Sequence, residues 1–577
     1  MRIHLLSFLA AAPLAAQAVV DYELTAAAGT VDLGPGYTSE PARLYNGTLP
    51  GPVLHATEGQ TLRVRLHNEL IDSTILHFHG QPLPQGMDGM QVISRPETAP
   101  GQEFLYELPN LEPGTYWFHP HSDQHTQLDS GLAGVLIVDP ANPADDPVFD
   151  TDHVIVLDDW NAMNTGGTYT GHLLNGKTSA GQATITVQPG EKMRLRFVNV
   201  AAMTNYVVAL DGHPMTVTHT DGGRLQSVVT DAIPIGIGER YDVIVDCNNP
   251  GVWSLAVSTL ENRSATVVRG IVRYAGQTGA DPAAATVPSN LSSGALLSYT
   301  QLASYWPAST PITATPDLVQ PIVLGMQPAP GGGNWSINGE FWPNVTPIEV
   351  TLGDVVQFDY SSSSMGMLHS HPMHLHGQFV RLMGTAGGTT HPPRKDTVLV
   401  RPSGQPGSTW SVQYTADNPG SWLFHCHHMM HMMRGMMTLV NFTGDHDQDG
   451  RVDHDDMDPD RAAPVLTIAS DAAAFQLGGN GTIDLQWQPY ALSAVYVSTV
   501  ELPYAVPLPL YGELRVDALA AAALGVAVHD AAGLGGVAYV MPSNPVLVGA
   551  RVALQAISTT TLPSGLVLST HQAMTLR

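Results

Sequence analysis

The stretch HCHHMMHMMRGMM, residues 425–437, indicates both the fold and the chemistry of this chain. It holds one of the two cysteines, with four histidines and six methionines, and it ends the strand-like segment GSWLFHCH that starts at Gly420. Similar segments begin at Gly114 (GTYWFHPH) and at Gly251 (GVWSLAVS). Five residues after each glycine stand His119, Ala256 and His425. The pattern predicts three copies of one β unit, with metal-ligand types only in the first and the third.

A second repeat precedes each of these strands. Asn-Gly pairs begin at Asn46, Asn175 and Asn338, and each is followed by a glycine turn and a strand of alternating polar and apolar residues. Alternation with a period of two is typical of a half-buried sandwich strand. The 56 glycines and 44 prolines between Val-, Thr- and Leu-rich runs also favour short strands. We therefore expect an all-β chain of three β-sandwich domains followed by a C-terminal β-rich module.

At 577 residues the chain is too long for one hydrophobic core. The motifs and changes in composition predict the following division: a signal peptide at 1–18, a first domain at 19–142, a second domain without the metal-ligand types at 143–280, an Ala-, Pro-, Ser- and Thr-rich linker at 281–320, a third domain at 321–444, an aspartate loop at 445–460 and a β-rich module of unassigned role at 461–577.

Charge and the N-terminal segment limit the protein's partners and location. The net charge of −27 argues against a nucleic-acid partner, which requires a basic surface. Residues 1–18 contain an early arginine, an apolar run and Ala16-Gln17-Ala18, the pattern of a Sec-type signal peptide. No other segment has the length and apolar character of a transmembrane helix. We expect an exported protein, periplasmic or extracellular, in which Cys247 and Cys426 remain unpaired.

Four histidine clusters carry the chemistry. They are HFHG (His77, His79), HPHSDQH (His119, His121), HPMHLHG (His371, His374, His376) and the 425–437 stretch. Residues i and i+2 of a strand face the same side, so each His-x-His pair can direct two imidazoles at one point. A single pair is more often an ordinary surface or core feature, but four clusters confined to the outer repeats are not. A thiolate, two imidazoles and a weak thioether describe a blue-copper site, and Cys426, His371, His431 and Met436 can supply this set.

Together these four motifs resemble the copper motifs of the three-domain multicopper oxidases, a family that includes laccases, bilirubin oxidases and bacterial cuprous oxidases. The resemblance covers roughly residues 20–443 and implies that the three sandwich domains are cupredoxin-like. It implies four copper ions, with the type 1 copper held by His371, Cys426, His431 and Met436, the type 2 copper by His77 and His374, and the type 3 pair by His79, His119, His121, His376, His425 and His427. It further implies that single electrons from a reductant reach the three-copper cluster, where O₂ is reduced to water.

Two residues near the motifs bear on proton delivery. Asp88, in PQGMDGM, matches the aspartate near the type 2 copper of bacterial relatives, which makes it the candidate catalytic residue for proton transfer. The alternative is a turn aspartate beside Gly89. Bacterial cuprous oxidases often carry glutamate just before the second type 1 histidine, whereas this chain has Met430 there. A proton route through that position must therefore differ.

The reductant is open between two classes. A laccase-like enzyme takes electrons from phenols or similar small organic molecules, and a cuprous oxidase takes them from Cu(I). The methionines without a predicted ligand role are soft enough to dock Cu(I) or flexible enough to be core fillers; they are Met429, Met430, Met432, Met433, Met437, Met365, Met367 and Met373. We expect laccase-like activity, with copper oxidation as the alternative. A copper-storage protein without turnover is the non-enzymatic alternative.

An acidic stretch follows the third repeat. In DHDQDGRVDHDDMDPD, aspartates stand at positions 1, 3, 5, 9 and 12 of an EF-hand-type loop with Gly450 at position 6; they are Asp445, Asp447, Asp449, Asp453 and Asp456. This spacing predicts a calcium site, and the alternative is a solvated acidic linker.

Overall fold

The computed structural model describes residues 18–91, 93–328, 333–363 and 369–444, together with ten strands between residues 465 and 575. The aspartate loop at 445–460, Met365, Met367 and the first 17 residues of the expected signal peptide lie outside the described residues. None of the helices in the described part of the chain is long and apolar enough to span a membrane.

The first unit consists of two four-stranded sheets, ordered β2-β1-β4-β6 and β3-β8-β7-β5. A buried apolar cluster that includes Leu62, Tyr106 and Phe118 fills the space between them. Its strands are β1 (Val19–Val31), β2 (Glu40–Tyr45), β3 (Val53–Thr57), β4 (Thr61–Asn68), β5 (Leu76–His79), β6 (Glu103–Leu108), β7 (Gly114–Pro120) and β8 (Gly134–Asp139), with the short helices η1 (Gln85–Met87), α1 (Gln124–Gln127) and η2 (Pro143–Asp145).

The second unit has a six-stranded sheet, β10-β9-β12-β17-β14-β15, and a five-stranded sheet, β11-β19-β18-β13-β16. Its core includes Leu195, Phe197 and Tyr241. Its elements are β9 (Thr151–Trp160), α2 (Ala162–Thr165), β10 (Gly171–Leu174), β11 (Thr184–Val187), β12 (Lys192–Asn199), β13 (Tyr206–Leu210), β14 (Met215–Thr220), β15 (Gly223–Thr230), β16 (Ile233–Ile235), β17 (Arg240–Asp246), β18 (Val252–Thr259) and β19 (Val268–Tyr274).

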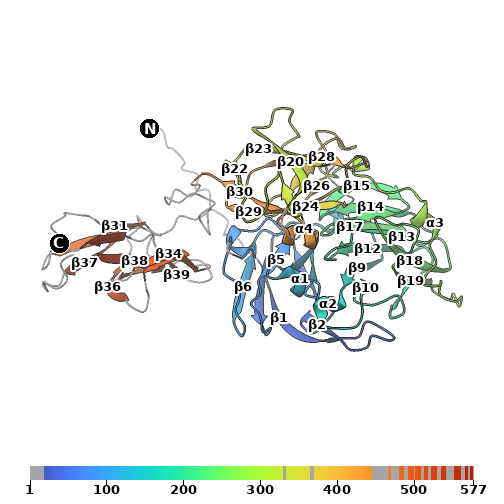
Figure 1. The fold of residues 1–577 in the computed structure, drawn as a ribbon, viewed down its shortest axis with the longest axis horizontal. Coiled ribbons are helices and arrows are strands. Elements are labelled where there is room, and N and C mark those ends of the chain that lie inside the picture. Colours follow the sequence, from blue (N-terminus) through green and yellow to red (C-terminus); the bar gives the residue numbers. More distant parts are fainter. Residues whose placement is uncertain are drawn as a thin grey trace, which may run out of the picture.

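The third unit repeats this plan with sheets β21-β20-β23-β28-β25-β26 and β22-β30-β29-β24-β27 around a core that includes Phe358 and Trp422. Its elements are β20 (Leu318–Gln327), β21 (Asn334–Ile337), β22 (Ile348–Val350), β23 (Val355–Ser362), β24 (His371–Leu375), β25 (Val380–Leu382), β26 (Arg394–Lys395), β27 (Thr397–Val400), β28 (Thr409–Thr415), β29 (Ser421–Cys426), α4 (Met429–Met433) and β30 (Met437–Phe442). Figure 1 shows β5, β24, β29 and α4 together at the centre of the three units. The three sandwiches expected from the repeats, and the cupredoxin-like fold implied by the family resemblance, are confirmed.

The repeated Asn-Gly turns have one structural role in all three units. Asn46, Asn175 and Asn338 adopt positive φ values of 51°, 47° and 54°, a conformation that asparagine tolerates better than most residues. Each side chain accepts a hydrogen bond from a backbone N–H of the unit's first strand, at 2.7, 2.6 and 2.7 Å. Each side-chain amide also donates to a carbonyl of that same strand. The sequence repeat therefore marks the same fastening of a turn to β1, β9 and β20.

Residues 281–320, expected to form a linker, are packed against the second and third units. They contain α3 (Ser289–Ser292) and η3 (Tyr299–Gln301), and the side chains of Leu291 and Leu302 are fully buried. The hydroxyl of Tyr299 donates to Glu239 and accepts from the backbone N–H of Leu399 at 3.0 Å. The segment thus connects the two units through specific contacts.

The C-terminal part is β-rich, as expected. Its strands form a sheet of β31, β32 and β37, a sheet of β36, β33, β38 and β39 in which β40 pairs with β38, and the hairpin β34–β35. They are β31 (Val465–Ile468), β32 (Asn480–Gln486), β33 (Leu492–Ser498), β34 (Glu501–Leu508), β35 (Gly512–Val516), β36 (Ala521–Val528), β37 (Leu534–Val540), β38 (Arg551–Thr559), β39 (Leu566–Leu568) and β40 (Gln572–Thr575).

Three carboxyl groups are buried where the first and second units meet: Asp129, Asp158 and Asp159. Asp159 accepts hydrogen bonds from the backbone of Ala202 and from Thr204. Asp129 accepts one from Asn164, and its other oxygen has no partner among the described residues. Burial, and to a lesser extent the neighbouring Asp159, raise the pKa of Asp129 to about 8.

We expect Asp129→Asn to flatten the fall in stability between pH 5 and pH 8. The pKa of an aspartate in an unfolded chain is about 4, so between about pH 4 and 8 the folded state binds more protons than the unfolded state, and stability decreases as the pH rises. The decrease amounts to at most about 5 kcal/mol, since one pKa unit corresponds to about 1.4 kcal/mol. Calorimetric melting temperatures at pH 5 and pH 8 measure it. The exposed Asp139→Asn is the control; a parallel fall in wild type and Asp129→Asn would refute the prediction.

Candidate metal centre

Strand pairing brings the predicted histidines together in the first and third units. In the antiparallel pair β5–β7, His77 lies opposite His119. In the antiparallel pair β24–β29, His374 lies opposite His425. Directly opposite residues on adjacent strands have closely spaced Cβ atoms, so each pair presents imidazoles side by side. At the matching place in the second unit, Ala209 of β13 lies opposite Ala256 of β18, and both are fully buried. The middle unit therefore uses packing residues where the outer units use ligands.

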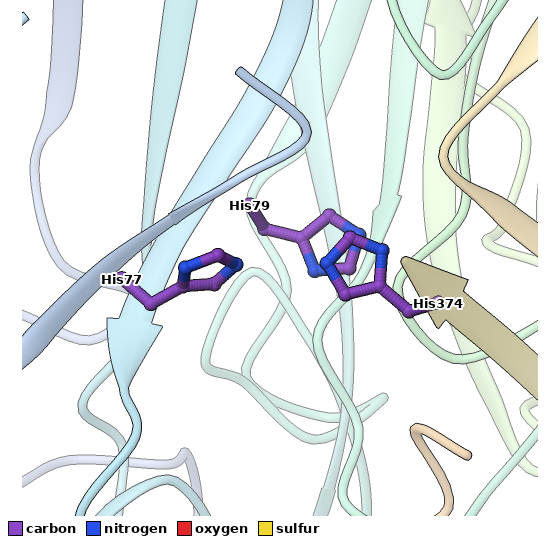
Figure 2. Close-up of side chains that lie close together, drawn as sticks. All are labelled: His77, His79 and His374. Atoms are coloured by element: carbon purple, nitrogen blue, oxygen red, sulfur yellow. The ribbon is translucent and has the colours of Figure 1, made fainter. Parts of the chain in front are cut away.

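Eight histidines from the two outer units meet in one buried cluster. Their ring nitrogens form three groups in which all ligand atoms lie within 4.8 Å of one another: His77 with His79 and His374, His79 with His119 and His427, and His121 with His376 and His425. Figure 2 shows His77 directed at the nearly parallel rings of His79 and His374, whose centroids are 3.7 Å apart. All eight side chains are buried. The sequence-predicted type 2 and type 3 ligands thus lie together without exception.

The free ring nitrogens of this cluster fit metal binding. Nδ1 of His77, His119, His374 and His425 lies within hydrogen-bond distance of a backbone carbonyl, of Asp88, Pro120, Asp396 and Cys426 respectively. The Nε2 atoms of His77, His119, His121, His374 and His427 have no partner among the described residues. Buried polar atoms are nearly always satisfied, so unpartnered nitrogens that converge on one another fit a metal-binding site. His79 is turned the other way: its Nδ1 is unpartnered, and its Nε2 lies 3.0 Å from Asp396 and from Thr397.

Burial keeps seven of these imidazoles neutral. It lowers the pKa of six of them well below the ordinary value, and neighbouring histidines lower the pKa further; the six are His79, His119, His121, His374, His376 and His427. Burial also lowers the pKa of His425 to about 4. A neutral imidazole has a lone pair to give to a metal ion.

The predicted type 1 ligands form a second buried group beside this cluster. Cys426 Sγ lies 3.8 Å from Nδ1 of His371 and 3.4 Å from Nδ1 of His431. Met436 is fully buried, its carbonyl accepts a 3.0 Å hydrogen bond from the N–H of Cys426, and its own N–H donates to the carbonyl of His431 at 3.0 Å. These two bonds hold the cysteine, the second histidine and the methionine in one compact loop around α4. Trp335 covers this group, with its ring centroid 3.8 Å from that of His431.

Asp88 contacts two ligands of the histidine cluster. Its carboxylate accepts a hydrogen bond from Nδ1 of His376 at 2.9 Å, and its backbone carbonyl accepts one from Nδ1 of His77 at 2.7 Å. The aspartate expected near the type 2 ligands therefore also orients a predicted type 3 ligand. Gly89 follows it at φ 76°, and a Cβ there would lie 1.9 Å from the carbonyl oxygen of Leu76. Only glycine allows the approach that brings Asp88 to both imidazoles.

The second unit supplies supporting residues that sequence reasoning missed. Arg240 of β17 forms two hydrogen bonds to Asp396, at 2.7 and 2.6 Å, and Asp396 holds His79. Lys395 pairs with Asp221 and Glu239 at 2.9 and 2.8 Å, and all three are fully buried. The run RKD at 394–396, directly before the apolar strand β27, is the sequence signal for these residues, because charged side chains at the start of a buried strand need buried partners.

The unassigned methionines divide by exposure. Met429 and Met432 are buried in an apolar cluster with Trp117 and Val198, between the first and second units. Met373 is also buried. These three are core residues, which is one of the two roles that the sequence left open. Met430 and Met433 are 39% and 48% exposed on the same helix α4. Both cysteines of the chain are free, as expected.

Comparison with known proteins agrees with this geometry. Three multicopper oxidase family models match residues 29–143, 150–277 and 315–444. The chain is 31% identical over 465 residues to the multicopper oxidase MmcO of Mycobacterium tuberculosis, covering 73% of this chain and 86% of that protein. It is 28% identical to laccase-4 of Thanatephorus cucumeris, covering 69% and 85%.

Solved structures show the same fold. The multicopper oxidase Fet3p, which functions in iron import, superposes with a TM-score of 0.63 at 22% identity, covering 74% of this chain and 90% of that one. A laccase from Botrytis aclada gives 0.62 at 24% identity, covering 74% and 88%. The chain therefore belongs to the multicopper oxidase family, oxidoreductases that hold copper and pass electrons from a reductant to O₂.

Proposed function

We propose that this protein is a laccase-like oxidase that couples one-electron oxidation of phenols or similar small organic molecules to four-electron reduction of O₂ to water. It uses four copper ions: a type 1 ion at His371, Cys426, His431 and Met436, a type 2 ion at His77 and His374, and a type 3 pair at the other six histidines. The observation that carries the proposal is the complete set of ten histidines and one cysteine, all buried and grouped as these centres require. Bound copper supplies the redox chemistry.

The chain itself provides the link between the two centres. Cys426 faces the type 1 group, whereas its neighbours His425 and His427 belong to the histidine cluster. Alternate residues of a strand point to opposite faces, so a single strand end, that of β29, serves both centres. The covalent path from the Cys426 sulfur to either imidazole runs through one peptide bond and two side chains. This path is the route we propose for electrons.

Asp88 is the residue we propose for proton delivery. It is buried, and its carboxylate bonds to His376 while its carbonyl bonds to His77. Among the described residues Asp396 makes a comparable pair of contacts, from its carboxylate to Nε2 of His79 and from its backbone carbonyl to Nδ1 of His374. Asp396 is already bound by Arg240 through both of its oxygens. In the described part of the chain no lysine or arginine is paired with the Asp88 carboxylate, which lies beside His77 and His376 instead, so Asp88 is the carboxylate we propose as the proton carrier.

We expect the copper-loaded protein to consume one O₂ for every four phenol molecules oxidised by one electron. An oxygen electrode combined with a peroxide assay measures the stoichiometry. Oxidation that stops after one equivalent of the bound copper would favour a copper-storage protein instead. One peroxide released per two electrons would contradict reduction to water.

Cuprous oxidase activity is the second candidate, favoured by the exposed thioethers of Met430 and Met433 beside His431. Thioethers are soft ligands that suit Cu(I). Replacing the phenol by Cu(I) in the same oxygen-electrode experiment tests it.

We further propose that the protein is exported, to the periplasm or the extracellular space, on the basis of its N-terminal segment at residues 1–18, and that residues 445–460 bind calcium.

A further inference from the structure

A third group of imidazoles shares His431 with the proposed type 1 site. Its other two members, His369 and His428, have no role in the proposed copper sites. The ligand atoms of His369, His428 and His431 all lie within 4.8 Å of one another. His428 stacks on His431 with ring centroids 3.9 Å apart and an interplanar angle of 10°. His369 stands nearly perpendicular to both rings, at 83° to His428 and 90° to His431.

This group forms a path from the surface to the type 1 ligands. His369 is exposed, His428 is half-buried and His431 is buried. Nδ1 of His428 is itself buried and has no hydrogen-bond partner among the described residues. His428 also precedes helix α4 without capping it through its side chain. An unpartnered buried nitrogen requires an explanation, and a bound cation beside the exposed His369 provides one.

The ring orientations determine which pair holds the cation. Nδ1 of His431 faces the Cys426 sulfur at 3.4 Å, so this nitrogen belongs to the type 1 group. An imidazole binds metal through a lone pair in the plane of its ring, and two parallel stacked rings cannot direct such lone pairs at one ion. Perpendicular rings can. His369 and His428 are therefore the pair that can hold one ion, with His431 stacked behind His428.

We propose that His369 and His428 bind a reduced transition-metal ion, Cu(I), as an electron-donating substrate. The proposal rests on the oxidase function proposed above. Cu(I) gives up one electron to become Cu(II), and the electron crosses the His428–His431 stack to the type 1 centre. Four such electrons and four protons convert one O₂ into two waters.

Two features favour this ion over others. Imidazole binds copper, iron, nickel and zinc, and of these ions Cu(I) and Fe(II) readily lose one electron. The exposed thioethers of Met430 and Met433 on α4 match Cu(I), the softer of the two. The net charge of −27 raises the concentration of any cation at the surface.

The first experiment measures binding without turnover. The probe is Ag(I), a soft ion of the same charge as Cu(I) that does not give up an electron, titrated into the four-copper holoenzyme. We expect one Ag(I) per chain and a shift of the type 1 absorption band, because the ion lies against the ring that stacks on His431. In His369→Ala and in His428→Phe, which keeps an aromatic ring on His431, the Ag(I) affinity should fall at least about tenfold.

The second experiment compares substrates. In both variants the ratio of kcat/KM for Cu(I) to kcat/KM for a phenol should fall at least about tenfold. The control His55→Ala removes an exposed histidine from β3 and should leave the ratio unchanged. A fall in the Fe(II) ratio without a fall in the Cu(I) ratio would overturn the choice of ion. A fall caused by Met433→Leu but by neither histidine variant would overturn the site.

Failure of the inference differs from failure of the proposed function. If wild type consumes O₂ with phenol while both variants keep the wild-type Ag(I) affinity and substrate ratio, the inference is overturned and the oxidase stands. If wild type binds Ag(I) in a manner dependent on His369 but consumes no O₂ with either reductant, the oxidase function is overturned and with it the substrate role of the site.

Discussion

Replacement of Cys426 by serine is expected to abolish the blue absorption of the copper-loaded protein and its O₂ consumption with every reductant. The thiolate is the ligand that defines a blue-copper site. In the described chain Cys426 is the only cysteine near the two type 1 histidines, with Sγ 3.8 Å from Nδ1 of His371 and 3.4 Å from Nδ1 of His431. Its loss also removes the sulfur end of the covalent path to His425 and His427. Visible absorption spectra and an oxygen electrode measure the two effects.

Cys247→Ser is the matched control. Cys247 is the other free cysteine and is equally buried, but it belongs to the core of the second unit, where Ala209 and Ala256 stand at the ligand positions. Its replacement should leave the blue absorption unchanged. Turnover retained in Cys426→Ser would disprove the assignment of the type 1 site and with it the proposed function.

Replacement of Asp88 by asparagine is expected to slow O₂ reduction roughly 100- to 10,000-fold, the usual range for losing a general acid or base. Asparagine can still accept the hydrogen bond from Nδ1 of His376, so the ligand keeps its position, but an amide carries no transferable proton at neutral pH. The type 1 centre should still be reduced by phenol in the absence of O₂. Stopped-flow spectroscopy would show normal bleaching of the blue band and slow recovery when O₂ is added.

The pH profile separates proton transfer from ligand positioning. If Asp88 carries the proton, the variant loses the pH dependence of reoxidation and Asp88→Glu restores part of the rate. Asp123→Asn removes an exposed aspartate paired with His125 and serves as the control. Reoxidation of Asp88→Asn at the wild-type rate would mean that Asp88 only shapes the turn before Gly89.

Repetition and spacing in the sequence were sufficient for the architecture. The Asn-Gly turns predicted three similar units because the same side-chain hydrogen bonds fasten each turn to its neighbouring first strand. These are contacts within a unit, between segments about 20 residues apart, and they leave a mark that repeats along the chain. The His-x-His pairs were equally readable, since the two-residue period of a strand is a local property.

Two features could not be predicted in full from the sequence. The composition of 281–320 suggested a linker, but Leu291, Tyr299 and Leu302 pack against the second and third units. The methionines of 425–437 looked alike, yet α4 buries Met429 and Met432 and exposes Met430 and Met433. The helical period places these residues on different faces of α4, but it does not show which face is buried. The residues that bury it, including Trp117 and Val198, lie far away in the sequence.

By itself, the sequence determined the all-β units, the outer pair of histidine-bearing strands and the set of residues that we propose as copper ligands. Tertiary structure alone decided how they combine. It brought His376 to Asp88 across 288 positions, His79 to Asp396 across 317, and Arg240 of the ligand-free unit to that same aspartate. Strand periodicity determines which face of a sheet a side chain points to. The residue that it contacts depends on how separate sheets pack, and no local sequence pattern encodes that packing.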